Sequence, residues 1–227
     1  FIPDDIYVEE PATLLNAYVE AIRQLGSWVI GEAPVTAIRT DRGEVTGVST
    51  PRGDIAAPLV VDAAGAWSRG IGALAGVEVA VAPVRHQLLI TRPVAGMSPT
   101  EPIARIVDAS AYLRPARGGI MMGGMESDPL AIDPRRDPTF TIADTPLDMA
   151  ILDTFTAALG PLVPALGDTP VAEHRGGLFT MTPDARFLAG PMPGLRGFWT
   201  ATGCNGSGFS ISAGIGRALA EWAISGA

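Results

Sequence analysis

A glycine-rich turn near the C-terminus is the segment of the chain best suited to chemistry. The apolar run from Phe198 to Thr202 leads into residues 203–209 (GCNGSGF), and a long helix with an apolar face is expected to follow. Unpaired N–H groups at the start of such a helix, together with its positive end, suit an electron-rich oxygen of a bound cofactor. The alternative is a tight strand-to-helix connection whose glycines only permit close packing.

Two further segments allow the same pair of interpretations. Residues 60–68 (VVDAAGAWS) place small residues at a strand end, where the backbone can approach a flat ligand or simply pack as a small-residue corner. Residues 174–184 (HRGGLFTMTPD) end in a Pro-Asp turn. The planar guanidinium of Arg175 could bind a substrate carboxylate, or Arg175 could be a surface arginine beside a loop.

The histidines and the cysteine carry weaker signals. His86 could be a base or a cofactor contact, although a lone histidine is more often structural; His174 is expected to be exposed or structural. A helix N-terminus could lower the pKa of Cys204, but a small buried thiol is the alternative. One cysteine excludes an internal disulfide, and two histidines are too few for a zinc site without carboxylates, so no metal site is expected. This cysteine usage makes a reducing cytoplasm the expected location.

Composition limits the class of protein. The chain has 227 residues, of which 47% are hydrophobic and 18% charged, so it can bury a large core. A net charge of −8 argues against nucleic acid and anionic membranes as partners. No apolar run is long enough to predict a membrane span.

The elements that must position these residues alternate between helix and strand at both ends of the chain, whereas the middle is rich in strands. Helices are predicted at 11–25, 69–75, 146–159 and after 208. Strands are predicted at 28–30, 34–40, 44–50, 59–64, 84–91, 111–115, 120–124, 178–181 and 198–202. This pattern indicates an α/β domain interrupted by a mainly antiparallel insert, with boundaries near Pro83 and Arg175.

Taken in order, these segments resemble the FAD-dependent amino-acid oxidoreductases of the D-amino-acid oxidase superfamily. The resemblance is to the branch of glycine oxidase, sarcosine oxidase and dimethylglycine dehydrogenase, and it runs over nearly the whole chain. The motifs that carry it are VDAAGAWS at 61–68, RHQ at 85–87, YLRP at 112–115, MTPD at 181–184 and the turn at 203–209. It implies a partial Rossmann-like FAD-binding domain, residues 1–82 and 176–227, with an inserted antiparallel substrate-binding domain, residues 83–175.

The resemblance also implies a reaction, in which a hydride passes from a small amino acid or amine to the flavin. It places Tyr112, Arg114 and Arg175 at the catalytic, substrate-binding side, with Glu126 on the next strand. The cofactor-binding residues that it implies are Val35, Ala64, Gly65, Trp67, Gly203, Asn205, Gly206, Ser207, Gly208 and Phe209.

Three departures from the family pattern qualify this prediction. The Gly-x-Gly-x-x-Gly segment that binds the FAD pyrophosphate is absent from the chain. Gly177 stands where sarcosine oxidases carry the cysteine that bonds the flavin, so FAD would bind this chain non-covalently. Ser210 replaces a lysine that promotes reaction with oxygen, which favours a dehydrogenase or a slow oxidase. The alternative is a non-catalytic truncated module, or a subunit that binds FAD only with a partner chain or a missing N-terminal segment.

Overall fold

The computed structural model describes residues 6–226, which divide into two compact units. The first unit contains residues 6–31, 86–129 and 142–177, and the second contains residues 32–85, 130–141 and 178–226. Strands β5 (Ala82–Thr91) and β9 (Val171–Met181) contribute residues to both units.

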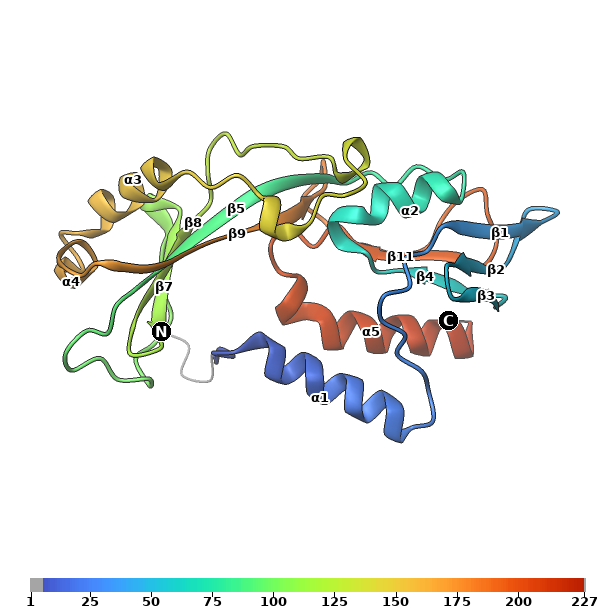
Figure 1. Ribbon diagram of the computed structural model, residues 1–227, viewed down its shortest axis with the longest axis horizontal. Helices are drawn as coiled ribbons and strands as arrows, with labels where there is room; N and C mark the ends of the chain where they lie inside the picture. The colour runs from blue at the N-terminus through green and yellow to red at the C-terminus, as the bar shows by residue number, and fades with distance from the viewer. Residues whose placement is uncertain (1–5, 227) are drawn as a thin grey trace. The chain divides into compact units, whose positions relative to one another are not determined.

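The first unit is built on a five-stranded sheet with the order β6-β7-β8-β5-β9. Figure 1 labels the last four of these strands. Strands β6 (Ala104–Ile106), β7 (Ala111–Ala116) and β8 (Gly119–Gly124) are successively antiparallel, and β8 pairs antiparallel with β5. The β7–β8 hairpin turns at Arg117 and Gly118, which both have positive φ. The predicted strand–turn–strand unit in the middle of the chain is therefore present.

Helices α3 (Met149–Leu159) and α4 (Pro164–Asp168) cover one face of this sheet. Their side chains join those of the strands in one buried cluster, which contains Leu89, Ala111, Ile120, Met122, Leu152, Leu159 and Leu166. Because successive side chains of a strand point to opposite faces, Tyr112 and Arg114 project from the face away from this core. The sequence pattern thus separates a packing face from a polar face.

The second unit holds two three-stranded sheets. Strands β1 (Ala37–Asp41), β2 (Glu44–Thr50) and β3 (Gly53–Ala56) form an antiparallel meander, whose first hairpin turns at Arg42 and Gly43. In the other sheet, β11 (Phe198–Thr202) lies between β10 (Leu188–Pro191), to which it is antiparallel, and β4 (Val60–Asp62), to which it is parallel.

Two helices of the second unit follow the strands that carry the predicted cofactor motifs. The 3₁₀ turn η1 (Gly65–Trp67) and helix α2 (Ser68–Leu74) follow β4, and helix α5 (Gly208–Ser225) follows β11. Phe198 is fully buried in a cluster with Ile38, Val45 and Leu195, which anchors β11 at its start. Shorter 3₁₀ turns are η2 (Val107–Ala109), η3 (Pro134–Arg136) and η4 (Ile142–Asp144).

Helix α1 (Pro11–Gln24) begins with a proline in its first turn, as predicted, and groups with the first unit rather than with residues 32–85. The residues just before the helix link it to that unit, because Glu9 and Glu10 contact Arg117 on the β7–β8 hairpin. The strand predicted at 28–30 is wrong: among the described residues these three pair with no strand, and Trp28 is 85% exposed.

The mixed helix-and-strand fold with antiparallel sheets confirms the predicted fold class. The chain passes from one unit to the other at 31/32, 85/86, 129/130, 141/142 and 177/178. The division into an FAD-binding domain, residues 1–82 and 176–227, and a substrate-binding domain, residues 83–175, stays a prediction. Within residues 6–226, no helix is both long and apolar enough to span a bilayer.

Candidate functional site

The two glycine-containing motifs of the second unit meet at one edge of a sheet. Strands β4 and β11 run parallel, with Asp62 opposite Thr200, so their carboxyl ends lie at the same edge. The turns that follow, residues 63–67 and 203–207, are therefore neighbours, and together they are called the strand edge below. Ligands of α/β sheets bind outside the carboxyl ends of parallel strands.

Two buried threonines of β11 tie this edge together. The Thr202 hydroxyl donates a hydrogen bond to the Gly65 carbonyl at 3.3 Å, and the Thr200 hydroxyl donates to the Asp62 carbonyl at 3.4 Å. Both side chains are almost fully buried. Strand β11 therefore fixes the position of the turn that follows β4.

Asp62 shapes that turn from within. Its Oδ1 accepts hydrogen bonds from the Ala64 N–H at 3.0 Å and the Ser68 hydroxyl at 3.2 Å. Burial raises the pKa of the Asp62 carboxyl, although these two hydrogen bonds oppose the change. Among the residues that the structure describes, Asp62 Oδ2 is buried and has no hydrogen-bond partner.

Asn205 builds the second turn. Its side-chain Oδ1 accepts from the Thr182 N–H at 3.0 Å, and its Nδ2 donates to the Gly203 carbonyl at 2.7 Å. Its backbone has a φ of 49°, and its N–H donates to the Thr180 carbonyl at 2.9 Å. The side chain of Asn205 is thus committed to the turn, and the MTPD motif is joined to that turn through Thr182.

The glycines of the strand edge serve different purposes. A Cβ on Gly203 would lie 2.4 Å from Thr182 Cγ2, and a Cβ on Gly206 would lie 2.9 Å from the Phe179 ring, so packing inside the chain already requires both glycines. Gly65 has a φ of 56°, and a Cβ there would meet no atom within 4 Å. A side chain at Gly65 would therefore project into open space at the strand edge.

In the first unit, the polar face of the sheet brings together two titratable side chains. The Nε2 of His86 on β5 lies 2.7 Å from the Tyr112 hydroxyl on β7, and the two rings are stacked 5.9 Å apart. Burial lowers the pKa of His86 to about 4 and raises the pKa of Tyr112 to about 12, so both groups are uncharged at neutral pH. Sequence reasoning left His86 as a lone histidine, and the RHQ motif was its only signal.

Gln87, the next residue, is a buried hub on the other face of β5. Its Nε2 donates to Glu126 Oε1 at 3.1 Å, and its Oε1 accepts from the Asp148 N–H at 2.6 Å. His174 Nε2 lies 3.1 Å from the same Oε1. Gln87 therefore holds Glu126, the start of α3 and strand β9 in fixed positions relative to β5. The contact of His174 with Gln87 agrees with the structural role predicted for that histidine.

Comparison with known proteins identifies the family. Residues 1–222 match the sequence family described as FAD dependent oxidoreductase. The chain belongs to this family. It is 33% identical over 231 residues to human mitochondrial sarcosine dehydrogenase, covering 100% of this chain and 25% of that protein. This confirms the resemblance to the sarcosine and dimethylglycine dehydrogenase branch.

The chain is also similar to a regulatory subunit and to a solved dehydrogenase structure, and it covers only part of each of these proteins. The chain is 31% identical over 242 residues to the mitochondrial pyruvate dehydrogenase phosphatase regulatory subunit of Mus musculus, covering 100% of this chain and 26% of that protein. The structure resembles L-proline dehydrogenase from P. horikoshii with a TM-score of 0.82 at 24% identity, covering 95% of this chain and 56% of that one, which shows the shared fold. The chain spans about a quarter of the length of the curated relatives named here.

The strand edge fits a flavin of the kind that this FAD-dependent family uses. Within the described residues, no side chain caps α5 at Ser207, so the first N–H groups of the helix and its positive end are left for a ligand. Phe209 and Trp67 are 42% and 37% exposed and offer flat apolar surface. The open space at Gly65 admits a ligand close to the backbone.

Val35 and Cys204 contribute differently. Val35 packs against the buried cluster that includes Phe198 and supports the sheet from inside. Gly208 begins α5, and a Cβ there would be 3.4 Å from Cys204. Burial raises the pKa of the Cys204 thiol, which excludes the activated thiolate that its place near a helix start could have produced.

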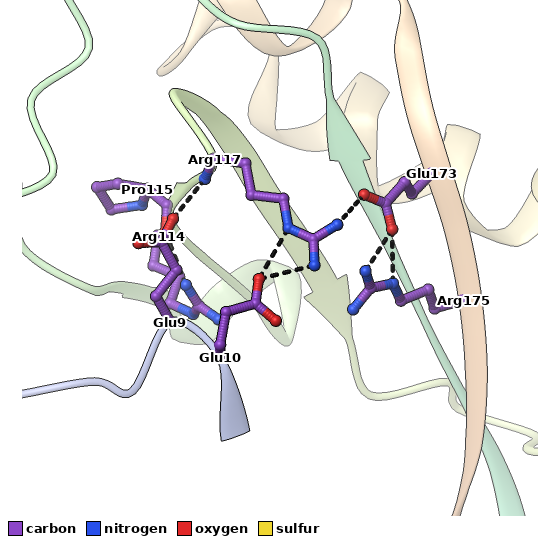
Figure 2. Close-up of polar contacts among 7 residues, drawn as sticks. All are labelled: Glu9, Glu10, Arg114, Pro115, Arg117, Glu173 and Arg175. Carbon is purple, nitrogen blue, oxygen red and sulfur yellow. Dashed lines mark hydrogen bonds and ion pairs between the residues drawn. The ribbon is translucent and has the colours of Figure 1, made fainter. Parts of the chain in front are cut away.

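The two arginines predicted on the substrate side have partners of their own (Figure 2). Arg114 donates from Nη1 to the Pro115 carbonyl at 2.8 Å. Its guanidinium lies 4.6 Å from the centre of the Tyr7 ring. Burial lowers the pKa of Arg114. Arg175 is 46% exposed and donates from Nε to Glu173 Oε2 at 2.7 Å, with a second, shorter ion-pair contact from Nη2.

Glu173 extends this pairing into a network centred on Arg117. Arg117 pairs with Glu173 and donates from Nε and Nη2 to Glu10 Oε1 at 2.9 and 2.7 Å (Figure 2). Its backbone N–H donates to Glu9 Oε1 at 2.7 Å. The structure thus joins Tyr112 to His86, and it joins Arg175 to an ion-pair network. Over residues 6–226, no cluster of three or more His, Cys, Asp or Glu residues could hold a metal ion.

Proposed function

We propose that this chain forms the flavin-ring end and the substrate side of an FAD-dependent oxidoreductase that oxidises a C–N bond in a small amino acid or an N-methylated glycine. Family membership supports the reaction class, and the similarity to sarcosine dehydrogenase supports the substrate class. The observation that carries the proposal is the strand edge, where two glycine-containing turns and an uncapped helix start are neighbours.

Under this proposal the strand edge holds the cofactor largely through its backbone. Ala64, Gly65 and Trp67 would line one turn, and the N–H groups of Gly206, Gly208 and Phe209 would face the electron-rich ring oxygens. Ser207 would shape the turn, because its N–H donates to the Cys204 carbonyl at 2.8 Å. Asn205 and Gly203 would act by shaping the turn, because their own contacts are made inside the chain. Val35 would act from the underlying core. Residues 1–82 and 176–227 would then bind FAD, and residues 83–175 would bind substrate.

The sheet face of the first unit supplies the polar groups for the substrate. When bound, FAD supplies the acceptor for the hydride that leaves the substrate carbon. The uncharged pair of His86 and Tyr112 lies in a buried environment that favours a neutral amine over an ammonium ion, and amine oxidation by hydride transfer needs that neutral form. Its hydroxyl and imidazole can orient the amine by hydrogen bonding.

The substrate carboxylate requires a cation, and Arg114 and Arg175 are the two candidates. Arg114 is partly buried and held on both sides, by the Pro115 carbonyl and by the Tyr7 ring. Arg175 would have to share its guanidinium between the carboxylate and Glu173. Binding assays with the Arg114→Lys and Arg175→Lys variants distinguish the two, because lysine keeps the charge but loses the planar fork.

The absence of a lysine after the glycine turn supports a dehydrogenase or a slow oxidase. Ser210 occupies that place and donates its hydroxyl to the Ser207 carbonyl at 2.9 Å, within the first turn of α5. Oxygen consumption should therefore be slow compared with turnover in an artificial electron acceptor. Equal rates with oxygen and with the acceptor would contradict this part of the proposal.

The experiment that tests the function is anaerobic mixing of the full-length natural protein, loaded with FAD, with sarcosine, dimethylglycine, glycine and D-amino acids in turn. Bleaching of the visible flavin band by one of these compounds is the expected result. A flavin that stays oxidised with the whole panel would refute the proposal. A cytoplasmic location, proposed from cysteine usage alone, is tested by cell fractionation.

A second candidate is a non-catalytic role, either as a truncated module or as a subunit that depends on a partner chain or an additional N-terminal segment for FAD. The similarity to a protein named as a regulatory subunit favours it. Flavin absorbance of the purified protein separates the two candidates. A colourless protein that takes up no added FAD supports the second, and a yellow protein whose flavin is reduced by substrate supports the first.

A further inference from the structure

Gly123 on β8 lies directly opposite Tyr112 on β7. A Cβ on Gly123 would stand 2.5 Å from the Tyr112 hydroxyl oxygen, 2.7 Å from its Cζ and 3.2 Å from the Gln87 carbonyl oxygen. Gly123 does not have a positive φ, so its backbone conformation does not itself require glycine. The phenol of Tyr112 is therefore what excludes a side chain at this position.

The strand order explains why the phenol passes over this point. Tyr112 is on β7, Gly123 on β8 and His86 on β5, and β8 lies between the other two strands. Neighbouring strands are about 4.8 Å apart, so a contact between side chains of β7 and β5 must cross roughly 10 Å of sheet. The Tyr112 side chain makes this crossing and ends 2.7 Å from His86 Nε2. Any side chain on β8 at the crossing point would lift the ring from the sheet.

We propose that Gly123 is a positioning residue for the reaction. Because Gly123 has no side chain, the phenol of Tyr112 can lie over β8 and reach His86. This inference rests on the proposed function, in which that pair orients the substrate amine. Gly123 makes no polar contact with substrate or cofactor itself. It acts only by letting the phenol lie flat and hold its hydroxyl at one fixed place.

The next residue provides a matched control. A Cβ on Gly124 would lie 2.5 Å from Cζ of the Phe155 ring, on the face of the sheet that α3 covers. Gly124 is therefore a core-packing glycine, and Gly123 is the glycine of the polar face. Gly124→Ala should destabilise the protein and leave the hydrogen bond between Tyr112 and His86 in place.

The test is the Gly123→Ala variant of the full-length natural protein loaded with FAD. Its crystal structure should show the Tyr112 hydroxyl moved beyond hydrogen-bond distance from His86 Nε2. The value of kcat/KM for the amine substrate should fall by about 10²-fold, the usual result of misplacing a group by 1 Å, while the affinity for FAD is unchanged. In a Tyr112→Phe background, Gly123→Ala should cause little further loss, because the two changes act through one group.

A retained hydrogen bond in Gly123→Ala, or an equal loss of kcat/KM in the Tyr112→Phe background, would overturn the inference. If Gly123→Ala does not fold, the double variant with Tyr112→Leu decides: folding restored by the shorter side chain supports the inference, and continued misfolding assigns the clash to the Gln87 carbonyl and overturns it. If the wild-type flavin is not reduced by any substrate, the proposed function fails. The crystallographic distance still tests the positioning of Tyr112 in that case.

Discussion

The strand edge of the second unit and the polar face of the first unit use different means to prepare a site. The strand edge consists of two turns that side chains hold through backbone groups: Thr202 of β11 bonds the Gly65 carbonyl, and Asn205 bonds the Gly203 carbonyl and the Thr182 N–H. The polar face, formed by His86, Tyr112 and Arg114, consists of long side chains that contact other side chains and have shifted pKa values.

This difference separates the consequences of substitution. Changes at the strand edge should act on backbone conformation and hence on stability and FAD affinity. Changes at the polar face should act on rate and on pH dependence and leave the fold intact. A protein that binds a flat cofactor with its backbone and a small substrate with its side chains needs both kinds of region.

The largest effect is expected for Tyr112→Phe. Loss of the hydroxyl removes the group that contacts His86 Nε2, so the rate of anaerobic flavin reduction by substrate should fall by about 10³-fold, within the range for a positioned proton donor or acceptor. Stopped-flow absorbance measures this rate. Tyr18→Phe, at an exposed position on α1, is the control and should leave the rate unchanged. A rate within threefold of wild type would remove Tyr112 from the catalytic group.

His86 should make the stability of the first unit depend on pH. The pKa of His86 is lowered by burial from 6.5 to about 4, so the unfolded state binds a proton at a pH where the folded state does not. The free energy of the unfolding reaction that exposes β5 to hydrogen exchange should therefore fall by about 3 kcal/mol as the pH decreases from 6.5 to 4.

Hydrogen exchange of peptides that cover β5 measures this change in the full-length protein. The slope attributable to His86 should disappear in His86→Gln and persist in His174→Gln, at the other histidine of the chain. Identical slopes in wild type and His86→Gln would show that His86 is not buried in its neutral form.

A smaller effect is expected at the strand edge for Gly203→Ala. Its Cβ would meet Thr182 Cγ2 at 2.4 Å, and the φ of 66° would be strained by any side chain. Gly194→Ala is the matched control, since its φ is 88° but no atom lies within 4 Å of the new Cβ. Both variants lose about 1 kcal/mol to backbone strain, and overpacking should cost Gly203→Ala about 2 kcal/mol more. Thermal unfolding and FAD titration measure the difference, and equal losses would show that packing is not the reason for glycine at 203.

The smallest effect is expected for Asp62→Asn, and its sign is informative. Because burial raises the pKa of Asp62, the folded state favours the protonated acid, and the free energy of unfolding decreases as the pH rises from 3.8 through the folded pKa. Asparagine has the same shape as the protonated acid and keeps the Oδ1 acceptor. The free energy of unfolding of the variant should therefore not decrease over this pH range, and the variant should be slightly more stable than wild type at neutral pH. Hydrogen exchange of peptides covering β4 checks this, with the exposed Asp41→Asn as control. A less stable Asp62→Asn would indicate an ionised carboxylate with a partner at Oδ2.

Much of the fold could be predicted from local pattern. The helix after Pro11 and the strands at 44–50 and 198–202 were found with bounds within a residue, because periodicity and turn residues act over short distances. Strand β10 (188–191) was missed, since its four residues contain a glycine and a proline and give no alternation. The segment 28–30 has strand-forming residues but no neighbouring strand to pair with.

The site was predictable as a set of motifs and not as a geometry. The glycine turn and the AAGAW segment were each identified, but their adjacency depends on the parallel pairing of β4 with β11, which joins residues 138 positions apart. Likewise, the contact between His86 and Tyr112 depends on the reach of the Tyr112 side chain across β8. The fork geometry of Arg175 predicts a carboxylate partner, and in the structure that partner is Glu173, two residues earlier in the same strand.

The ion pair between Glu10 and Arg117 also bears on how the chain folds. It links residues 107 positions apart, and the Arg117 partner exists in its bound position only after the β7–β8 hairpin has turned. Closing so long a loop is entropically costly, so the segment before α1 should dock after the hairpin has formed. A chain emerging from the ribosome would therefore carry α1 undocked until the β7–β8 hairpin had also emerged and formed.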